Sequence, residues 1–146
     1  MPYSDLLKGR FSETNRIYHI TWVTLKRKPL FLELDKARTI IKSLKSAHEQ
    51  GWCFSYCFVV MPDHVHWLVQ LRSKTLDELI HSIKSFTGNQ SILKTESQIW
   101  QRGYFDQAIR SEAMLKPFAR YIVSNPIRAG LVANIRDYPH WDAVWF

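Results

Sequence analysis

The chain has few cysteines and no long apolar run, and both shortages narrow the classes to which it can belong. Its 146 residues include only two cysteines, Cys53 and Cys57, in a segment that reads as a strand. At about 3.3 Å per residue their Cα atoms would lie roughly 13 Å apart, too far for a disulfide. We interpret them as buried thiols and expect a reducing, cytoplasmic setting. No stretch approaches the length of a membrane span, so no membrane association is predicted.

Acidic residues are also scarce relative to basic ones. The chain has 13 Asp and Glu against 20 Lys and Arg, which gives a net charge of +7. A basic surface favours polyanions, and nucleic acid is the commonest of these. Charge alone leaves open a simpler interpretation, a basic protein without a nucleic-acid partner.

The pattern of apolar residues predicts a single domain over residues 1–146, because 46% of the chain is hydrophobic and the length suits one core. Strands are predicted at 17–25, 52–60, 64–71 and 103–110, and helices at 35–50, 75–90 and 111–125. The expected helix N-caps are Asp35, Thr75 and Ser111, with Glu78 completing a capping box. Pro117 should kink the last helix or delay its regular part. The tail from about 126 to 146 is apolar enough to pack back on the domain.

The order of these elements is β-α-β-β-α-β followed by a helix, which is typical of the ferredoxin-like split βαβ fold in the α+β class. We expect a four-stranded antiparallel sheet with two helices on one face. The other face stays open unless the added C-terminal helix lies on it. This fold carries many functions, so function must be argued from a site.

Two histidines, His64 and His66, stand two apart in the strand predicted at 64–71. Side chains alternate along a strand, so both rings point to one face, while Val65 and Trp67 point to the helix-covered face. Neutral imidazoles at this spacing can chelate one divalent metal. The alternative is a pair of surface or hydrogen-bonded histidines. His19 shares the open face, and we interpret it as a lone buried histidine with one hydrogen bond rather than as a ligand.

Tyr121 and Asn125 are four residues apart in the predicted last helix, so they would share one face of it. If that helix covers the open face of the sheet, Asn125 could offer a carbonyl oxygen to the metal. A phenol one turn away is a candidate nucleophile, although with a free pKa of about 10 it would need metal or cationic help at neutral pH. The alternative is that Tyr121 anchors an amphipathic helix and Asn125 ends it.

Three segments, "MPDHVHWLV", "WQRGYFDQAIR" and "ARYIVSNPIRAGLV", occur in this order. Together with "YHITWVT" and "IKSFT", they resemble the REP-associated tyrosine transposases, a branch of the single-tyrosine HUH transposases. The resemblance runs from about residue 15 to about residue 132. Two departures stand out, since the family often has a histidine at the position of Gln107 and the tail "YPHWDAVWF" is not a close match.

The resemblance implies a bacterial enzyme that cleaves single-stranded DNA near small repeated hairpins and rejoins strands through a 5′-phosphotyrosine link. His64 and His66 match the metal ligands of the family, Asn125 matches the third ligand position and Tyr121 matches the catalytic tyrosine. The metal would be Mg²⁺ or Mn²⁺. Related proteins act as monomers or as homodimers, and both states stay open here.

A DNA-binding surface is expected around these segments, since basic side chains suit phosphate contacts. The candidates are Lys26, Arg27, Lys28, Lys84, Arg102, Arg110, Arg120 and Arg128. Trp100, Tyr104 and Phe105 could stack on unpaired bases, with core packing an equal alternative for Phe105.

Rival functions fit less well. A non-catalytic ferredoxin-like nucleic-acid-binding protein would explain the charge and the fold, but not the paired histidines. A nucleotide hydrolase with a histidine-rich strand would need a third histidine, two positions after His66, where this chain has Leu68. A two-histidine phosphoesterase would need a second histidine strand, and His81 falls in a predicted helix.

Overall fold

The computed structural model describes residues 15–145, so the two ends of the domain predicted over 1–146 lie outside the described residues. One antiparallel sheet has the strand order β4-β1-β3-β2-β5. Its strands are β1 Ile17–Val23, β2 Cys53–Val60, β3 His64–Leu71, β4 Phe105–Ile109 and β5 Trp141–Ala143. The helices are α2 Leu34–Glu49, α3 Leu76–Gly88, α4 Leu115–Val123 and α5 Asn125–Arg128. No helix among the described residues combines the length and apolar character needed to cross a bilayer.

The predicted α+β class and its split βαβ order are confirmed, but the prediction of four strands is wrong. The fifth strand, β5, comes from the C-terminal tail and pairs with β2, with Cys57 opposite Ala143. This pairing covers part of a sheet edge that would otherwise expose unpaired backbone groups. A strand of three residues is too short to show the alternation that identified the others.

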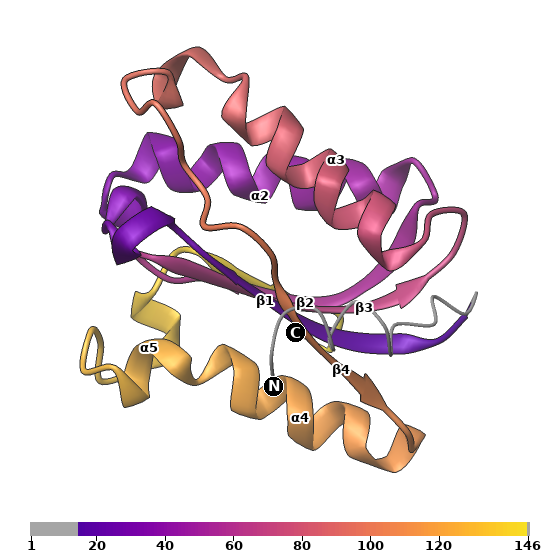
Figure 1. The fold of residues 1–146 in the computed structure, drawn as a ribbon. Helices are drawn as coiled ribbons and strands as arrows, with labels where there is room; N and C mark the ends of the chain where they lie inside the picture. Colours follow the sequence, from indigo (N-terminus) through magenta and orange to yellow (C-terminus); the bar gives the residue numbers. More distant parts are fainter. Residues whose placement is uncertain (1–14, 146) are drawn as a thin grey trace.

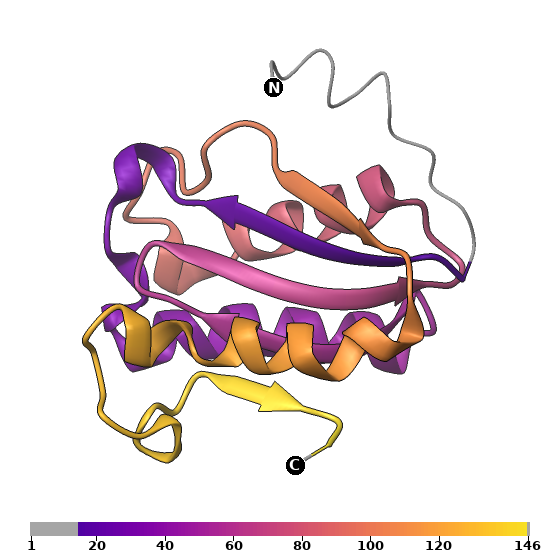
Figure 2. The same ribbon diagram turned by 90° about the horizontal axis from the view of Figure 1, so that it is seen from below.

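Helices cover both faces of the sheet, as Figure 1 and the turned view in Figure 2 show. Helices α2 and α3 lie on one face, over a core that includes Trp22, Val65 and Trp67. Helix α4 lies along the other face, where Ala119 and Ile122 share a second core with residues of β2 and β3. Of the two alternatives, the structure therefore has the last helix on this face of the sheet.

The ends of the helices test the predicted caps. The capping box of α3 is confirmed, because the Glu78 amide donates to Thr75 Oγ1 at 3.2 Å and the Thr75 amide donates to the Glu78 carboxylate at 2.9 Å. The Asp35 cap is wrong, since α2 begins at Leu34 with Glu33 before it. Ser111 precedes only a single 3₁₀ turn, and α4 starts at Leu115. Pro117 thus falls in the first turn of α4, where its missing N–H costs nothing.

Both cysteines are buried and free, in agreement with the predicted thiols. Burial raises the pKa of each thiol to about 12, so neither is a reactive thiolate at neutral pH. Their role is to fill space on β2.

His140, just before β5, makes acid stability testable. Its ring is buried against Tyr138, and burial, followed by the charge of Arg38, lowers its pKa. An unfolded chain, with an ordinary histidine pKa of about 6.5, binds the proton more readily, so this contribution to stability is lost as pH falls below that value. We expect His140→Phe to lose less stability than the natural chain between pH 7 and pH 5 in urea titrations. Equal losses in the two proteins would contradict this reading.

Candidate metal and nucleophile site

His64 and His66 lie at the start of β3, beside the last residues of β1, and their rings share the α4 side of the sheet, as predicted. Thr21 is the register partner of His66, and Val23 is the partner of His64. The two Nε2 atoms are 3.1 Å apart. Both imidazoles therefore direct the same nitrogen toward a common point.

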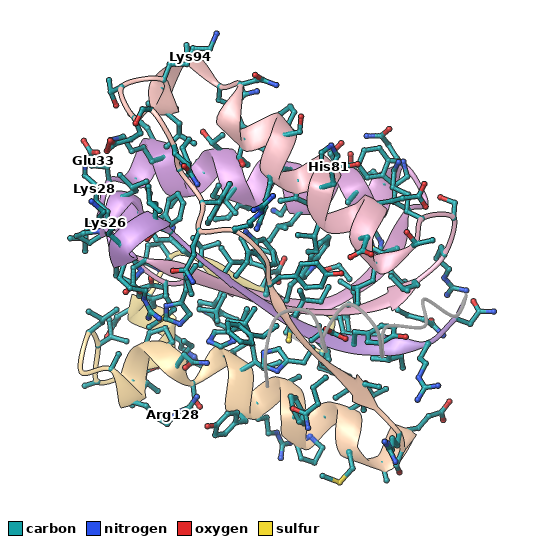
Figure 3. All side chains as sticks on the ribbon, in the orientation of Figure 1. Lys26, Lys28, Glu33, His81, Lys94 and Arg128 are labelled. Carbon is teal, nitrogen blue, oxygen red and sulfur yellow. The ribbon has the colours of Figure 1, made fainter. Side chains whose placement is uncertain are left out.

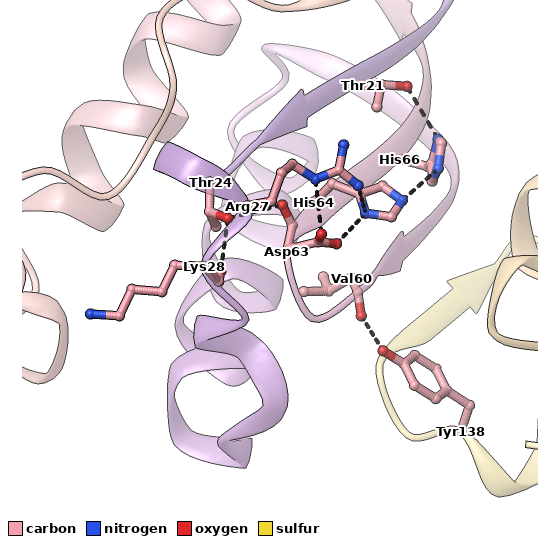
Figure 4. A network of polar contacts seen from close by, with 9 residues as sticks. All are labelled: Thr21, Thr24, Arg27, Lys28, Val60, Asp63, His64, His66 and Tyr138. Carbon is pink, nitrogen blue, oxygen red and sulfur yellow. Dashed lines mark hydrogen bonds and ion pairs between the residues drawn. The ribbon is translucent and has the colours of Figure 1, made fainter. Parts of the chain in front are cut away.

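The other nitrogen of His64 is held by a short chain of contacts (Figure 4). Its Nδ1 donates to Asp63 Oδ1 at 2.7 Å, and Asp63 Oδ2 accepts from Arg27 Nε at 2.8 Å. Burial would raise the pKa of the Asp63 carboxyl, but hydrogen bonds and positive charge from Arg27 and His64 together lower it. With Nδ1 engaged by the carboxylate, Nε2 is the ring nitrogen of His64 that can face a metal.

The ring of His66 is likewise held through its Nδ1 atom, by two side chains of β1. Its Nδ1 lies 2.9 Å from His19 Nε2 and 3.1 Å from Thr21 Oγ1, and either atom can accept its proton. Burial lowers the pKa of His19 to about 4; for His66, burial followed by nearby positive charges lowers it to about 3. The rings are thus neutral at pH 7, the form in which imidazole binds a metal. His19 lies on the shared face, but it is not the lone buried histidine that was predicted: it is half-buried, contacts both His66 and Thr21 and stacks on His66.

The geometry of the two Nε2 atoms fits a shared divalent ion. Two nitrogens bound at right angles to one octahedral ion at about 2.1 Å would be roughly 3.0 Å apart, close to the observed separation. Within residues 15–145 there is no cluster of three or more His, Cys, Asp or Glu side chains suited to a metal. A neutral oxygen, such as that of a side-chain amide, is another kind of ligand that a divalent ion accepts.

Asn125 is not in the same helix as Tyr121, so that prediction is wrong. Helix α4 ends at Val123, Ser124 follows, and Asn125 opens α5. Pro126 has no N–H for the Ile122 carbonyl, and the Asn125 side-chain Nδ2 donates to that carbonyl instead, at 2.7 Å. The amide nitrogen of Asn125 is thereby fixed on the backbone, and its oxygen is the atom that could serve as a ligand.

Tyr121 stands out among the tyrosines of residues 15–145, because it alone is exposed, at 61%. The Arg128 guanidinium lies 3.9 Å from the centre of its ring, and the same positive charge lowers the pKa of His66. One turn earlier in α4, the Phe118 ring meets His19 edge-on at 5.3 Å between centroids. Helix α4 thus contacts the group of His19, His64 and His66 through Phe118. Tyr121 lies one turn further along the same helix, under the Arg128 guanidinium.

The other tyrosines are engaged elsewhere. The Tyr104 hydroxyl donates to the Asp77 carboxylate, and the Tyr138 hydroxyl donates to the Val60 carbonyl at 2.6 Å. Tyr18 is buried, and Tyr56 stacks on Trp145. Tyr3 lies outside the described residues.

Comparison with known proteins decides the family. The family described as "Transposase IS200 like" matches residues 12–125, most of the chain. The chain belongs to the IS200-like transposase family. A Haemophilus influenzae protein provisionally named a REP-associated tyrosine transposase is 29% identical over 119 residues. That alignment covers 68% of this chain and 66% of the relative, so the chain spans slightly less than two thirds of the relative's length.

Solved structures agree on the fold of this IS200-like chain. A REP-associated tyrosine transposase bound to a REP hairpin superimposes with a TM-score of 0.76 at 19% identity, covering 90% of this chain and 79% of that one. A Deinococcus radiodurans R1 protein provisionally described as a transposase gives a TM-score of 0.56 at 20% identity, covering 77% and 92%. The resemblance inferred from the motifs is therefore confirmed.

The predicted DNA-binding cations of this family member are not equivalent. Arg27 is paired with Asp63, and Lys28 is paired with Glu96 at 2.5 Å. Lys84 is half-buried and donates to the carbonyls of Gln101 and Gly103 at 3.1 and 2.6 Å, so it fixes a loop. Arg27 and Lys28 are exposed although they are paired, and the other exposed candidates are Lys26, Arg102, Arg110, Arg120 and Arg128.

The aromatic residues proposed for base stacking also divide. Trp100 and Tyr104 are buried and cannot stack on DNA as they stand, so that part of the prediction is wrong. Phe105 is 57% exposed, and the core packing weighed as its alternative does not hold.

The residues that orient the histidines were missed from the sequence. The sequence pattern gives no sign that Asp63 orients a histidine, and it presents Arg27 only as a candidate phosphate contact. Their pairing joins positions 36 apart and depends on the β1–β3 register, which no local pattern encodes.

Proposed function

We propose that the chain is a metal-dependent endonuclease and strand-transferase for single-stranded DNA, acting near REP-type hairpins through Tyr121. The observation that carries the proposal is the pair of opposed Nε2 atoms on His64 and His66, with each Nδ1 held by a protein group. A non-catalytic DNA-binding protein would have no need to orient two half-buried imidazoles in this way.

A divalent ion, Mg²⁺ or Mn²⁺, would be held by His64, His66 and the amide oxygen of Asn125. When bound, it would polarise the scissile phosphate and neutralise the charge that develops on its oxygens. The Asp63 carboxylate and the His19 ring would keep the ligand nitrogens in the neutral tautomer that binds metal.

Tyr121 would supply the nucleophile. Its hydroxyl oxygen attacks phosphorus, the bond from phosphorus to the 3′ oxygen breaks, and the phenolic proton leaves as the 3′ oxygen gains one. The products are a 5′-phosphotyrosine and a free 3′-hydroxyl. Attack of a 3′-hydroxyl on that link restores the phenol and joins strands, and no external energy source is needed because one ester replaces another. Arg128, whose guanidinium lies over the Tyr121 ring, would contact the phosphate.

The substrate class follows from charge and relatives together. The net charge of +7 suits a polyanion, and one structural neighbour is a transposase bound to a REP hairpin. We infer a hairpin with unpaired flanks as the ligand of this chain. The chain would act as a monomer or a homodimer.

A labelling experiment tests the proposed function. Hairpin oligonucleotides with unpaired flanks, labelled at the 5′ or 3′ end, are incubated with the protein and Mg²⁺ or Mn²⁺. Denaturing gels should show a protein adduct that retains the 3′ label and a released fragment that carries the 5′ label. Tight binding without adduct or cleavage with either metal would favour the non-catalytic alternative.

The support given to His64 by Asp63 makes a prediction about metal affinity. Asp63→Asn should weaken Mn²⁺ binding by about 10- to 100-fold, because the loss of a carboxylate behind a histidine ligand has effects of this size. Isothermal titration calorimetry would measure it, with the exposed Asp35→Asn on α2 as the matched control. Unchanged affinity in Asp63→Asn would show that the contact does not support a ligand.

A further inference from the structure

Two grooves lie on either side of residues 96–99, beside the end of β1. The segment is held there by the backbone, because the Leu25 amide donates to the Ile99 carbonyl at 2.9 Å and the Gln101 amide donates to the Val23 carbonyl at 3.0 Å. The first groove, of about 380 Å³, is lined by residues 25–30 and 96–99. The second, of about 550 Å³, is lined by Lys84, Gly88 and residues 96–103. Residues 96–99 thus form a ridge shared by both.

The first groove begins at the histidine site, because Arg27 belongs to both. The Arg27 guanidinium donates to Asp63, the residue that contacts His64. Arg27 is also one of the residues that line the first groove. Lys26 and Arg27 both have φ of 55°, the left-handed conformation that residues other than glycine rarely adopt. Thr24 braces this turn, since its hydroxyl lies 2.8 Å from the Lys28 carbonyl and 3.1 Å from the Asp63 carbonyl. Such local strain is typically retained at functional sites.

The charges lining the grooves are strongly unequal. The basic residues are Lys26, Arg27, Lys28, Lys84 and Arg102, and the one acidic residue in either lining is Glu96. Figure 3 shows Lys26 and Lys28 together at the end of the sheet. Glu96 lines both grooves and pairs with Lys28 across the first of them, at 2.5 Å. The single carboxylate therefore occupies the place where a phosphate would meet Lys28.

We propose that the two grooves form one path for the unpaired DNA that flanks the cleaved phosphate, and that the Lys28–Glu96 ion pair closes this path until a phosphate displaces Glu96. The proposal rests on the proposed function for its substrate. Lys26 and Arg102 would contact the backbone on either side of the ridge, with Ser97 and Gln98 between them. Lys84, fixed on the carbonyls of Gln101 and Gly103, would hold the wall of the second groove.

The Lys28–Glu96 ion pair leads to an unusual expectation, that removing a charged side chain tightens DNA binding. Glu96→Gln frees Lys28 and removes the one carboxylate from the path, so we expect about three- to tenfold tighter binding of single-stranded DNA and a steeper salt dependence. Lys28→Ala and Arg102→Ala should each weaken binding and lower the slope of log K against log salt by about 0.7. The gain from Glu96→Gln should shrink when Lys28 is already alanine.

The experiment measures fluorescence anisotropy of a labelled oligonucleotide over a series of salt concentrations. All variants carry Tyr121→Phe and are measured in EDTA, so that no cleavage occurs. Lys42→Ala, an exposed lysine on α2, is the matched control and should change little. Circular dichroism melts show whether each variant is folded.

Several outcomes would overturn the path. Equal or weaker binding by folded Glu96→Gln is one, and equal affinity for a fully duplex DNA is another. Stronger binding to RNA of the same sequence would replace the DNA occupant with RNA. Adduct formation by the natural chain is scored separately. If the natural chain forms an adduct but Glu96→Gln has no effect on binding, the proposed function stands and the DNA path is wrong. If the salt effects appear as expected but no adduct forms, the DNA path stands and the proposed function is wrong.

Discussion

Tyr121→Phe is expected to lower the rate of covalent adduct formation by at least about 10⁴-fold, because loss of the attacking group removes the covalent step itself. The substitution removes one exposed oxygen and keeps the ring that Arg128 contacts, so fold and DNA affinity should persist. Denaturing gels with labelled DNA measure the adduct, and anisotropy measures the binding.

The matched control is Tyr104→Phe. The Tyr104 ring is buried and its hydroxyl donates to the exposed Asp77, so the variant should lose about 1 kcal/mol of stability. Adduct formation should stay within about an order of magnitude of the natural rate. An adduct that survives Tyr121→Phe and vanishes in Tyr104→Phe would reverse the assignment.

Replacing His64 and His66 together with alanine should lower cleavage by at least about 10³-fold, since the phosphate would lose the ion that stabilises its developing charge. Both rings are half-buried and lie outside the two apolar cores, so the variant should still fold. EDTA should have a similar effect on the natural chain, and added Mn²⁺ should restore it. Cleavage by the double variant in EDTA would contradict the metal role.

The sequence was most informative where a pattern repeats. Alternation in β3 placed Val65 and Trp67 in one core and both histidines on the opposite face, and the structure confirms this division. The capping box was equally easy to predict, because its two residues, Thr75 and Glu78, are only three positions apart in the sequence. Such local regularities specify side-chain direction without knowledge of the whole fold.

The sequence was least informative where distant segments meet or where one residue breaks a pattern. The Arg27–Asp63 pair and the Lys28–Glu96 pair each need a tertiary register. Periodicity placed Asn125 in the helix of Tyr121, but Pro126 removes one backbone donor and the Asn125 side chain replaces it. The sequence suggested that Lys84 is a surface cation. In the structure it is half-buried and donates to two backbone carbonyls, so it holds the loop at residues 101–103 in place.

The central claim is that Tyr121 becomes joined to the 5′ phosphate of cleaved DNA. The most direct measurement is mass spectrometry of the adduct after nuclease trimming and proteolysis. We expect the peptide containing Tyr121 to carry a nucleotide through a phosphodiester on the phenolic oxygen. A nucleotide located on Tyr104 or on any other residue would contradict the account.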